Sequence, residues 1–356
     1  MKKIVLTGGG TAGHVTPNLA LLPALKEADF TVSYIGSYEG IEKQLIKDAH
    51  VPYYPIASGQ LRRYFDWKNF TDPFRVIKGY GQALHLLRHL KPDVVFSKGG
   101  FVSVPVVLAA RQLHIPAIIH ESDMTPGLAN KIAIRGATKV CCNFPETLQH
   151  LPADKAVLTG SPIREELRHG DRERALRTLG FSEEKPILMI MGGSIGSVFI
   201  NTALRDALDE LLPDFQIIHL CGKGNLDPSK DGIPGYRQFE YVSEDLPDFF
   251  AAADLLLSRA GANAICEILA LRKPNILVPL SRNASRGDQI LNAKSFEKQG
   301  FSYYMEEESV TKESLVQAIL YVRDHREDYI KAMRTSKQQD SVRIIVELLT
   351  ACTEGR

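Results

Sequence analysis

The sequence predicts an α/β protein that contains two parallel-sheet domains in tandem. Short, continuously apolar runs recur along the chain, stretches with helical spacing separate them, and one strand-loop-helix pattern occurs twice. Strands that alternate with helices form parallel sheets, and continuous apolarity within a strand indicates that helices cover both faces of its sheet. The length of 356 residues also fits two domains better than one.

The apolar runs give the expected strands in chain order: 4–6, 32–35, 94–96, 117–119, 187–191, 216–220, 255–257 and 276–278. Between most of them, apolar residues recur with the period of a helix, as at Leu19, Leu22 and Leu25, and at Leu315, Ile319 and Val322. We therefore expect βα units throughout.

The repeated pattern sets the domain organisation. The segment IVLTGGGTAGH at residues 4–14 and the segment ILMIMGGSIGS at 187–197 both read as a strand that runs into a glycine loop and then a helix. This repeat predicts two Rossmann-like domains. We place their junction near LTGSPIREEL, where Gly160 and Pro162 interrupt the chain, so the domains are expected at 1–160 and 161–340. Residues 341–356 form a last helix that could join either domain, including a return to the first one.

Composition excludes several classes of protein. Hydrophobic residues make up 44% and charged residues 24%, and no stretch approaches the ~20 apolar residues of a membrane span. The start of the chain does not resemble a signal peptide, so we expect a cytosolic protein. The five cysteines are scattered without C-x-x-C spacing, which indicates buried thiols and neither a disulfide framework nor a zinc site. Residues 1–160 carry 18 Lys and Arg against 12 Asp and Glu, and the remainder 25 against 30.

The first glycine loop raises the possibility of a dinucleotide site. Gly8, Gly10 and Gly13 fit G-x-G-x-x-G, a turn that lets backbone N–H groups approach a phosphate. A dehydrogenase also needs an acid at the end of the second strand, where this chain has Gly36 and Ser37, with Glu39 only later. The nicotinamide hypothesis is weakened accordingly. A turn required only for packing stays an alternative.

Three further glycine-rich turns follow apolar strands and precede helices, at 97–105, 191–197 and 258–267. Ligands of open α/β sheets bind at this carboxyl edge. Four such loops in two domains predict a cleft between the domains that accepts phosphorylated ligands from both sides.

Seven motifs along the chain resemble those of one known family: GGGTAGHVTPNLAL, KPDVVFSKGGFVSVPVVLAA, IPAIIHESDMTPGLANKIA, TGSPIR, MGGSIGSVFIN, SRAGANAICEILALRKPNILVPL and GDQILNA. Together they resemble the MurG family, the peptidoglycan N-acetylglucosaminyltransferases with the GT-B fold (glycosyltransferase family 28). The resemblance covers nearly the whole chain. It implies transfer of GlcNAc from UDP-GlcNAc to undecaprenyl-diphospho-MurNAc-pentapeptide (lipid I), giving lipid II and UDP with a β-1,4 linkage and inversion. It also implies an acceptor-binding, membrane-associating first domain and a UDP-GlcNAc-binding second domain.

Site residues follow from the resemblance, position by position. Arg164 and Ser194 match contacts to the donor diphosphate, and Glu267 matches the acid on the ribose hydroxyls. The other positions that match the UDP-GlcNAc site are Thr11, Ala12, Gly13, Val242, Ala262, Asn263, Ala264, Ile265, Cys266 and Gln289. The chain has Asp123 where the family usually has Asn, so that donor contact is not carried over, and Phe101 replaces the usual tyrosine.

The attacking sugar hydroxyl needs a base near it. His14 matches the family's histidine on the acceptor side, and its ordinary pKa lies near working pH. Glu121 is the rival base, and His120 is either functional or packed in the core. Arg164, Ser194 and helix N-termini can stabilise the negative charge that develops on the departing diphosphate. Because the sequence holds no D-x-D, we expect neither a metal nor another cofactor.

Residues 61–91 carry seven Lys and Arg against two Asp, interleaved with aromatic and aliphatic side chains that include Trp67. This composition suits an anionic membrane surface, so we expect peripheral attachment to the cytoplasmic side of the cell membrane, where the lipid-linked acceptor would be met. Nucleic acid could bind the same composition, but no nucleic-acid motif accompanies it and we expect none. An ordinary amphipathic helix is the remaining alternative.

Three other functions stay open. A lipid glycosyltransferase of the same fold would share the loops but use another acceptor, such as diacylglycerol. A UDP-GlcNAc 2-epimerase would need no acceptor. A non-catalytic subunit would bind nucleotide sugar or membrane without turnover.

Overall fold

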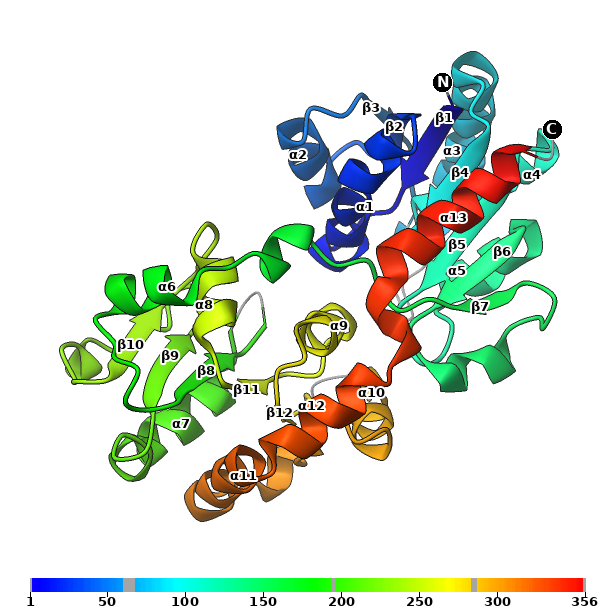
Figure 1. The fold of residues 1–356 in the computed structure, drawn as a ribbon. Coiled ribbons are helices and arrows are strands. Elements are labelled where there is room, and N and C mark those ends of the chain that lie inside the picture. The colour runs from blue at the N-terminus through cyan, green and yellow to red at the C-terminus, as the bar shows by residue number, and fades with distance from the viewer. Residues whose placement is uncertain (1, 60–67, 194–195, 283–286, 355–356) are drawn as a thin grey trace. The chain divides into compact units, whose positions relative to one another are not determined.

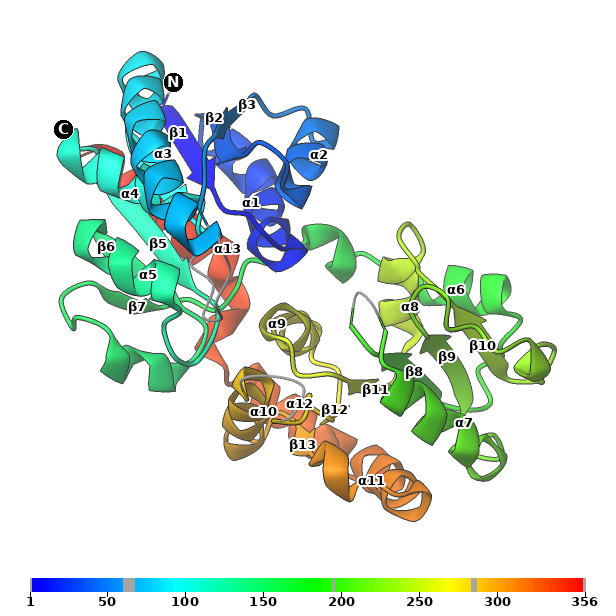
Figure 2. The same ribbon diagram turned by 180° about the vertical axis from the view of Figure 1, so that it is seen from behind.

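The computed structural model describes residues 2–59, 68–193, 196–282 and 287–354 (Figures 1 and 2). The chain divides into two compact units, one formed by Met1–Arg164 with Lys337–Arg356 and one by Glu165–Ser336. The first boundary therefore falls four residues after the expected position 160, and the second unit ends at Ser336 rather than at 340. Arg164 consequently lies in the first unit, whereas the sequence analysis assigned it to the second domain.

In its described residues, the first unit contains a seven-stranded parallel sheet of order β3-β2-β1-β4-β5-β6-β7. The strands are β1 (Lys2–Thr7), β2 (Phe30–Ser37), β3 (Tyr53–Ile56), β4 (Val94–Ser97), β5 (Ala117–Glu121), β6 (Lys139–Cys142) and β7 (Ala156–Leu158). The helices are α1 (Thr16–Glu27), α2 (Ile41–Asp48), α3 (Lys68–Leu90), α4 (Ser103–Gln112), α5 (Leu128–Ala133) and α13 (Ser341–Glu354), with 3₁₀ turns at Ala12–His14, Ile134–Gly136, Pro145–His150 and Lys337–Asp340.

Helices cover both faces of this sheet, as the continuous apolarity of its strands predicts. Val5 packs with α3, α4 and α5, whereas Ile4 and Leu6 pack on the other face with α1, α2 and α13. Figure 1 shows α13 returning to this unit, where Ile345 and Leu349 are fully buried, and Figure 2 shows α3 and α4 on the opposite side. The last helix is thus part of the first unit's core.

In its described residues, the second unit has a six-stranded parallel sheet of order β10-β9-β8-β11-β12-β13. The strands are β8 (Ile187–Met191), β9 (Gln216–Leu220), β10 (Tyr236–Phe239), β11 (Leu255–Ser258), β12 (Asn275–Leu277) and β13 (Tyr303–Tyr304). The helices are α6 (Arg172–Leu179), α7 (Val198–Leu211), α8 (Leu246–Ala252), α9 (Ala262–Leu271), α10 (Asp288–Lys298), α11 (Lys312–Asp324) and α12 (Arg326–Arg334), with 3₁₀ turns at Glu165–Arg168, Pro228–Lys230 and Glu307–Ser309.

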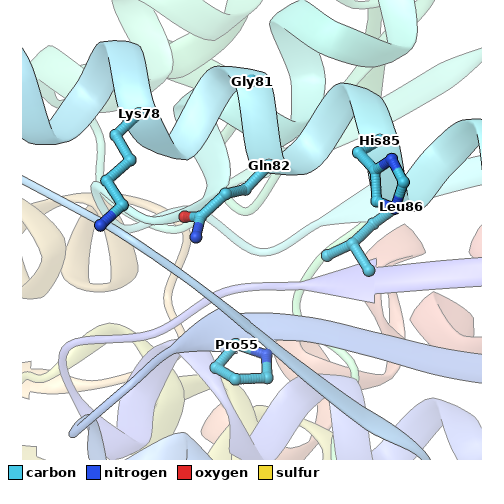
Figure 3. Close-up of a pocket in the computed structure, with 6 residues that line it drawn as sticks. All are labelled: Pro55, Lys78, Gly81, Gln82, His85 and Leu86. Atoms are coloured by element: carbon cyan, nitrogen blue, oxygen red, sulfur yellow. The ribbon is translucent and has the colours of Figure 1, made fainter.

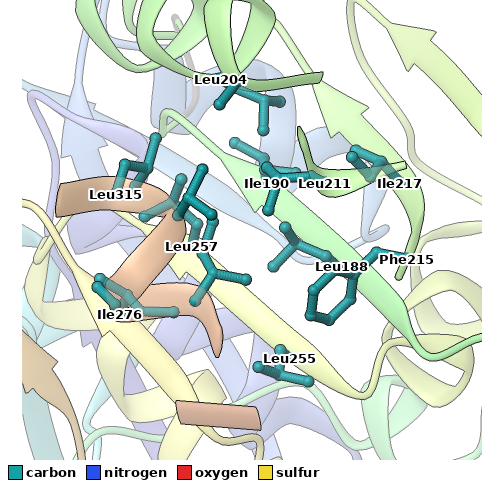
Figure 4. Packing of buried hydrophobic residues seen from close by; sticks show 14 of the residues in the cluster. Leu188, Ile190, Leu204, Leu211, Phe215, Ile217, Leu255, Leu257, Ile276 and Leu315 are labelled. Atoms are coloured by element: carbon teal, nitrogen blue, oxygen red, sulfur yellow. The ribbon is translucent and has the colours of Figure 1, made fainter. Parts of the chain in front are cut away.

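One face of this second sheet packs against α7 and α11. Figure 4 shows Leu188 and Ile190 of β8 meeting Leu257 of β11 and Leu204 of α7, all nearly free of solvent exposure. Replacing a buried leucine of this kind with alanine typically lowers the free energy of unfolding by about 2–5 kcal/mol. The cluster therefore stabilises the strands that carry the loops described below.

The predicted fold class, two parallel-sheet α/β domains, is confirmed. All eight predicted strands are present, and the structure adds five that the sequence analysis missed: β3, β6, β7, β10 and β13. Four of the five cysteines are buried and Cys352 is half-buried.

Candidate active site

The six strands of the second sheet follow the same order as the first six of the first sheet, which ends with the additional strand β7. This order places the four glycine-rich loops in pairs. β1 lies beside β4 in the first sheet, and β8 lies beside β11 in the second. The next strands after β1 and β8 lie on one side of each pair, and the next strands after β4 and β11 lie on the other side. Where the strand order reverses in this way, the connections diverge and leave a crevice at the carboxyl ends of the two strands. The glycine loops follow these four strands, so each unit has two of them at its crevice.

The two loops of the first unit touch through their backbones. A Cβ added to Gly100 would lie 2.3 Å from the carbonyl oxygen of Gly9, and Gly99 and Gly100 have φ angles of 98° and 84°. Only glycine combines this conformation with so close an approach. The β1 loop is therefore held directly against the β4 loop.

His14 ends the short 3₁₀ turn after β1. Its Nδ1 lies 3.0 Å from the carbonyl oxygen of Gly9 and 3.2 Å from Oγ1 of Thr11. Because a carbonyl can only accept, Nδ1 carries the hydrogen, and the lone pair of the neutral ring is on Nε2. Burial, followed by the charge of Lys98, lowers the pKa of His14, while the bond to Gly9 and the charge of Glu42 raise it. The ring is consequently neutral near pH 7 and able to accept a proton.

Lys98 and His120 form a buried polar chain beneath the same edge. The Lys98 Nζ donates to Nδ1 of His120 over 2.8 Å and also to Oγ of Ser122, and His120 Nε2 donates to the carbonyl oxygen of Gly160 over 2.8 Å. Burial and the Lys98 charge lower the pKa of His120 well below its usual value. His120 is thus packed in the core of the unit and neutral.

Glu121 follows His120 and is only 3% exposed. Its Oε1 accepts from the backbone N–H of Asp123, and its Oε2 accepts from Gly127 N and Asn130 Nδ2, at 2.9–3.0 Å. Burial raises its pKa, and these hydrogen bonds oppose the rise. Both oxygens are engaged in shaping the loop between β5 and α5, an arrangement that suits a structural role better than proton abstraction.

The first loop of the second unit turns tightly between β8 and α7. A Cβ on Gly192 would lie 2.4 Å from the amide nitrogen of Ser197, and one on Gly196 would lie 2.0 Å from the carbonyl oxygen of Cys221. Ser197 caps α7 by accepting from the N–H of Ile200. Ser194, the expected diphosphate contact, lies outside the described residues.

Arg259 joins the second loop of this unit to its surroundings. Its guanidinium donates to Oγ of Ser197 at 2.7 Å, to the carbonyl oxygens of Val278 and Pro279 at 3.1 Å, and to the carboxylate of Glu307. The side chain is 7% exposed and its charge is paired by Glu307. Arg259 therefore ties the β11 loop to the β8 loop and to the end of β12.

The expected nucleotide contacts gather at this same carboxyl edge. Gly261 begins α9, and Ala262, Asn263, Ala264 and Glu267 are partly exposed on its first two turns, whereas Ile265 and Cys266 are buried in the unit. Val242 follows β10, and Gln289 at the start of α10 accepts from the N–H of Leu280, just after β12. Apart from the buried Ile265 and Cys266, the edge therefore presents these residues from β10 across to β12.

In the first unit, Thr11 is exposed and accepts the backbone N–H of His14 through its carbonyl, and Ala12 and Gly13 form the 3₁₀ turn with His14. The sequence analysis missed the buried charged residues Glu42, Lys98 and Arg259. Lys98 and Arg259 each follow an apolar strand directly, with a glycine one residue later at Gly99 and two residues later at Gly261, a position that could have pointed to them.

The expected membrane-facing segment is partly described. On α3, Phe74 and Ile77 are 74% and 67% exposed, and Arg75 and Lys78 beside them are also exposed. Residues 61–67, including Trp67, lie outside the described residues. Figure 3 shows a hollow beside this helix, where Lys78 and Gln82 point from α3 toward Pro55. Within the described ranges, no helix is both long and apolar enough to cross a membrane.

Two parallel-sheet units with paired glycine loops at their carboxyl edges define a GT-B protein, the two-domain class that includes enzymes of nucleotide sugars. Residues 4–142 match the model of the glycosyltransferase family 28 N-terminal domain, and residues 187–348 match that of the glycosyltransferase family 28 C-terminal domain. This chain belongs to glycosyltransferase family 28.

Relatives and solved structures agree with this assignment. A protein of Lachnospira eligens named UDP-N-acetylglucosamine--N-acetylmuramyl-(pentapeptide) pyrophosphoryl-undecaprenol N-acetylglucosamine transferase is 62% identical over 98% of this chain and 99% of its own length. One of the same name from Clostridium botulinum is 55% identical over 99% and 100%. The crystal structure of Acinetobacter baumannii MurG superposes with a TM-score of 0.79 at 28% identity, over 99% of this chain and 100% of that one. The UDP-GlcNAc 2-epimerase of Methanocaldococcus jannaschii, with a TM-score of 0.66 at 14% identity over 98% and 99%, shares the fold.

Proposed function

We propose that this chain transfers N-acetylglucosamine from UDP-GlcNAc to lipid I, forming the β-1,4 linkage of lipid II with inversion and release of UDP. The observation that carries the proposal is the 62% identity, over nearly the full length of both chains, to a relative named for this reaction. The likeness to an epimerase is one of fold alone, at 14% identity. Because an epimerase needs no acceptor, a requirement for an acceptor distinguishes the transferase activity from the epimerase activity.

In this proposal the first unit activates the acceptor hydroxyl through His14. Its Nδ1 is bonded to Gly9, which leaves Nε2 to take the hydroxyl proton as the oxygen attacks the anomeric carbon. Glu121 is the alternative base, but its two oxygens already accept three hydrogen bonds. His14 is the better supported of the two.

The second unit would hold UDP-GlcNAc at its carboxyl edge. Glu267 on α9 is proposed to bind the ribose hydroxyls, and the N-terminus of α9 to face the nucleotide, because the partial positive charge at a helix N-terminus favours anions. The remaining proposed donor contacts are Thr11, Ala12, Gly13, Arg164, Ser194, Val242, Ala262, Asn263, Ala264, Ile265, Cys266 and Gln289. Arg164, Ser194 and helix N-termini would stabilise the departing diphosphate without a metal. Full activity in EDTA is expected, and a strict loss would overturn this last point.

Turnover with labelled UDP-GlcNAc tests the reaction, with and without a lipid I analogue. UDP release that depends on the analogue supports the proposal. Release without an acceptor, or formation of ManNAc, would indicate the epimerase instead, and dependence on diacylglycerol another lipid glycosyltransferase. Binding without any turnover would indicate a non-catalytic subunit.

We also propose that α3 attaches the protein to the cytoplasmic side of the membrane. Exposed Phe74 and Ile77 beside Arg75 and Lys78 combine apolar contact with attraction to anionic headgroups. The double variant F74S/I77S should sediment less with vesicles of phosphatidylglycerol and phosphatidylcholine than the wild type. Y321S, which removes a 47% exposed aromatic from the second unit, is the matched control. Equal sedimentation of all three proteins would contradict the assignment.

A further inference from the structure

One peptide group in the β1 loop contacts the side chains of both Glu42 and His14. The N–H of Gly10 donates to Oε2 of Glu42 over 3.2 Å, and the carbonyl oxygen of Gly9 accepts from Nδ1 of His14 over 3.0 Å. This N–H and this carbonyl belong to the same amide. Glu42 and His14 are therefore separated by a single planar group.

The position of Glu42 is built into the fold. Its side chain is fully buried, and Oε1 accepts from both the backbone N–H and the hydroxyl of Ser37. A Cβ on Gly9 would lie 2.5 Å from Oε1, and one on Gly40 would lie 2.1 Å from Oε2. The carboxylate fits only because both positions are glycine.

The arrangement has a chemical consequence for His14. An N–H that is bonded to an acceptor polarises its amide, which makes the carbonyl oxygen of the same amide a stronger acceptor. The carbonyl of Gly9 then holds the hydrogen on Nδ1, fixes the orientation of the ring and leaves the lone pair on Nε2.

We propose that Glu42 is a positioning residue for His14 and acts on it through the Gly9–Gly10 peptide. This inference rests on the proposed function, in which His14 is the base. As the acceptor oxygen bonds to the anomeric carbon, the sugar-phosphate bond breaks, its electron pair leaves with UDP, and the hydroxyl proton passes to Nε2. The imidazolium that forms is stabilised by Gly9 and, across the peptide, by Glu42.

The charges around His14 agree with this geometry. Burial lowers the pKa of the ring most, and the Lys98 ammonium from the β4 loop lowers it further. The Gly9 bond and the Glu42 charge on α2 act in the opposite direction. Removing the Glu42 charge should therefore make Nε2 a weaker base.

The test is E42Q, an isosteric change that places an amide N–H₂ against donors that need an acceptor. In ¹⁵N-histidine-labelled protein, long-range ¹H–¹⁵N spectra report which nitrogen of His14 carries the hydrogen and at which pH the ring titrates. We expect E42Q to show a weaker preference for the hydrogen on Nδ1, to titrate at lower pH and to shift the acid limb of kcat/KM the same way. Its kcat should fall at least ~10-fold, within the ~10²–10⁴-fold that a general base supplies, with the KM for UDP-GlcNAc unchanged.

S37A is the matched control, because it removes one donor to Oε1 and keeps both the carboxylate and its bond to Gly10. Its His14 spectrum should match that of the wild type. G9A is a second variant that tests the same contact, because its Cβ would displace the carboxylate of Glu42. Its His14 spectrum should show the changes expected for E42Q, so the test remains available if E42Q fails to fold. A wild-type His14 spectrum in folded E42Q or G9A would overturn the proposal. Full turnover of H14A would instead overturn the role of His14 as base, while the spectra still report the coupling to Glu42.

Discussion

The guanidinium of Arg259 donates a hydrogen bond to the hydroxyl of Ser197 over 2.7 Å. Ser197 also accepts the N–H of Ile200 and so begins α7, which means that one hydroxyl joins the β11 loop to the first turn of the helix after β8. A side chain that links both glycine loops should affect ligand binding as well as stability.

Ser197→Ala should lower the free energy of unfolding by about 1–2 kcal/mol, because it removes the cap of α7 and one partner of the buried Arg259. It should also raise the KM for UDP-GlcNAc, since the β8 loop loses its link to the β11 loop. Urea unfolding and initial rates measure the two effects. Thr311→Ala is the control, because it removes the capping box of α11 in the same unit. Matching KM values for the two variants would count against the role of Ser197.

His14→Ala should reduce kcat by about 10²–10⁴-fold, the usual contribution of a general base, and leave the KM for UDP-GlcNAc nearly unchanged. The physical reason is that Nε2 would no longer be present to take the hydroxyl proton. Acceptor-dependent UDP release measures the loss. His169→Ala, which changes an exposed histidine of the second unit, should retain full activity. Undiminished turnover by H14A would remove His14 from catalysis.

Lys98→Met should move the acid limb of kcat/KM to higher pH. The Lys98 ammonium lowers the pKa of His14, so removing the charge lets that pKa rise and the ring is protonated at a higher pH. The activity of a neutral base is lost as pH falls through its pKa. Rates from pH 5 to 9 test the direction, with Lys98→Arg as the control that keeps the charge. A limb that is unmoved in K98M, or moved to lower pH, contradicts this account.

His219 should make the second unit sensitive to acid. It is buried between Tyr236 and Asn201, and burial, followed by the Arg205 charge, lowers its pKa from 6.5 to about 3. Between these values the unfolded chain binds a proton that the folded state does not. The stabilisation is therefore fully present above pH 6.5 and is lost as pH falls toward 3.

From pH 7 to pH 5 this group should cost about 2 kcal/mol of the free energy of unfolding. His219→Asn removes the titration and keeps a polar side chain, so the variant should lose less stability than the wild type over this interval. Denaturant unfolding at both pH values measures the difference. Parallel losses in the two proteins would show that His219 is not the titrating group.

Much of the fold could be predicted because the central strands are continuously apolar. β1, β8 and β11 are buried on both faces over most of their length, so successive residues at 4–7, 187–190 and 255–258 are all buried. The missed strands lie toward the sides of the sheets or have mixed composition. β3 contains Pro55, β10 reads Tyr-Arg-Gln-Phe, and β13 has two residues. A parallel strand near an edge is defined by its one neighbour more than by its own sequence.

The sequence by itself determined the two α/β domains, the four glycine loops and the family whose motifs those loops carry. It did so because glycine turns and apolar strands are local features. Only the tertiary structure decided how the buried charges are paired. Glu42 lies 32 residues from Gly10, Lys98 lies 22 from His120, and Arg259 lies 62 from Ser197. Because the spacing of residues along the chain does not reveal which distant backbone donor a carboxylate will meet, the link from Glu42 to His14 became visible only when the strands had brought α2 and the β1 loop together.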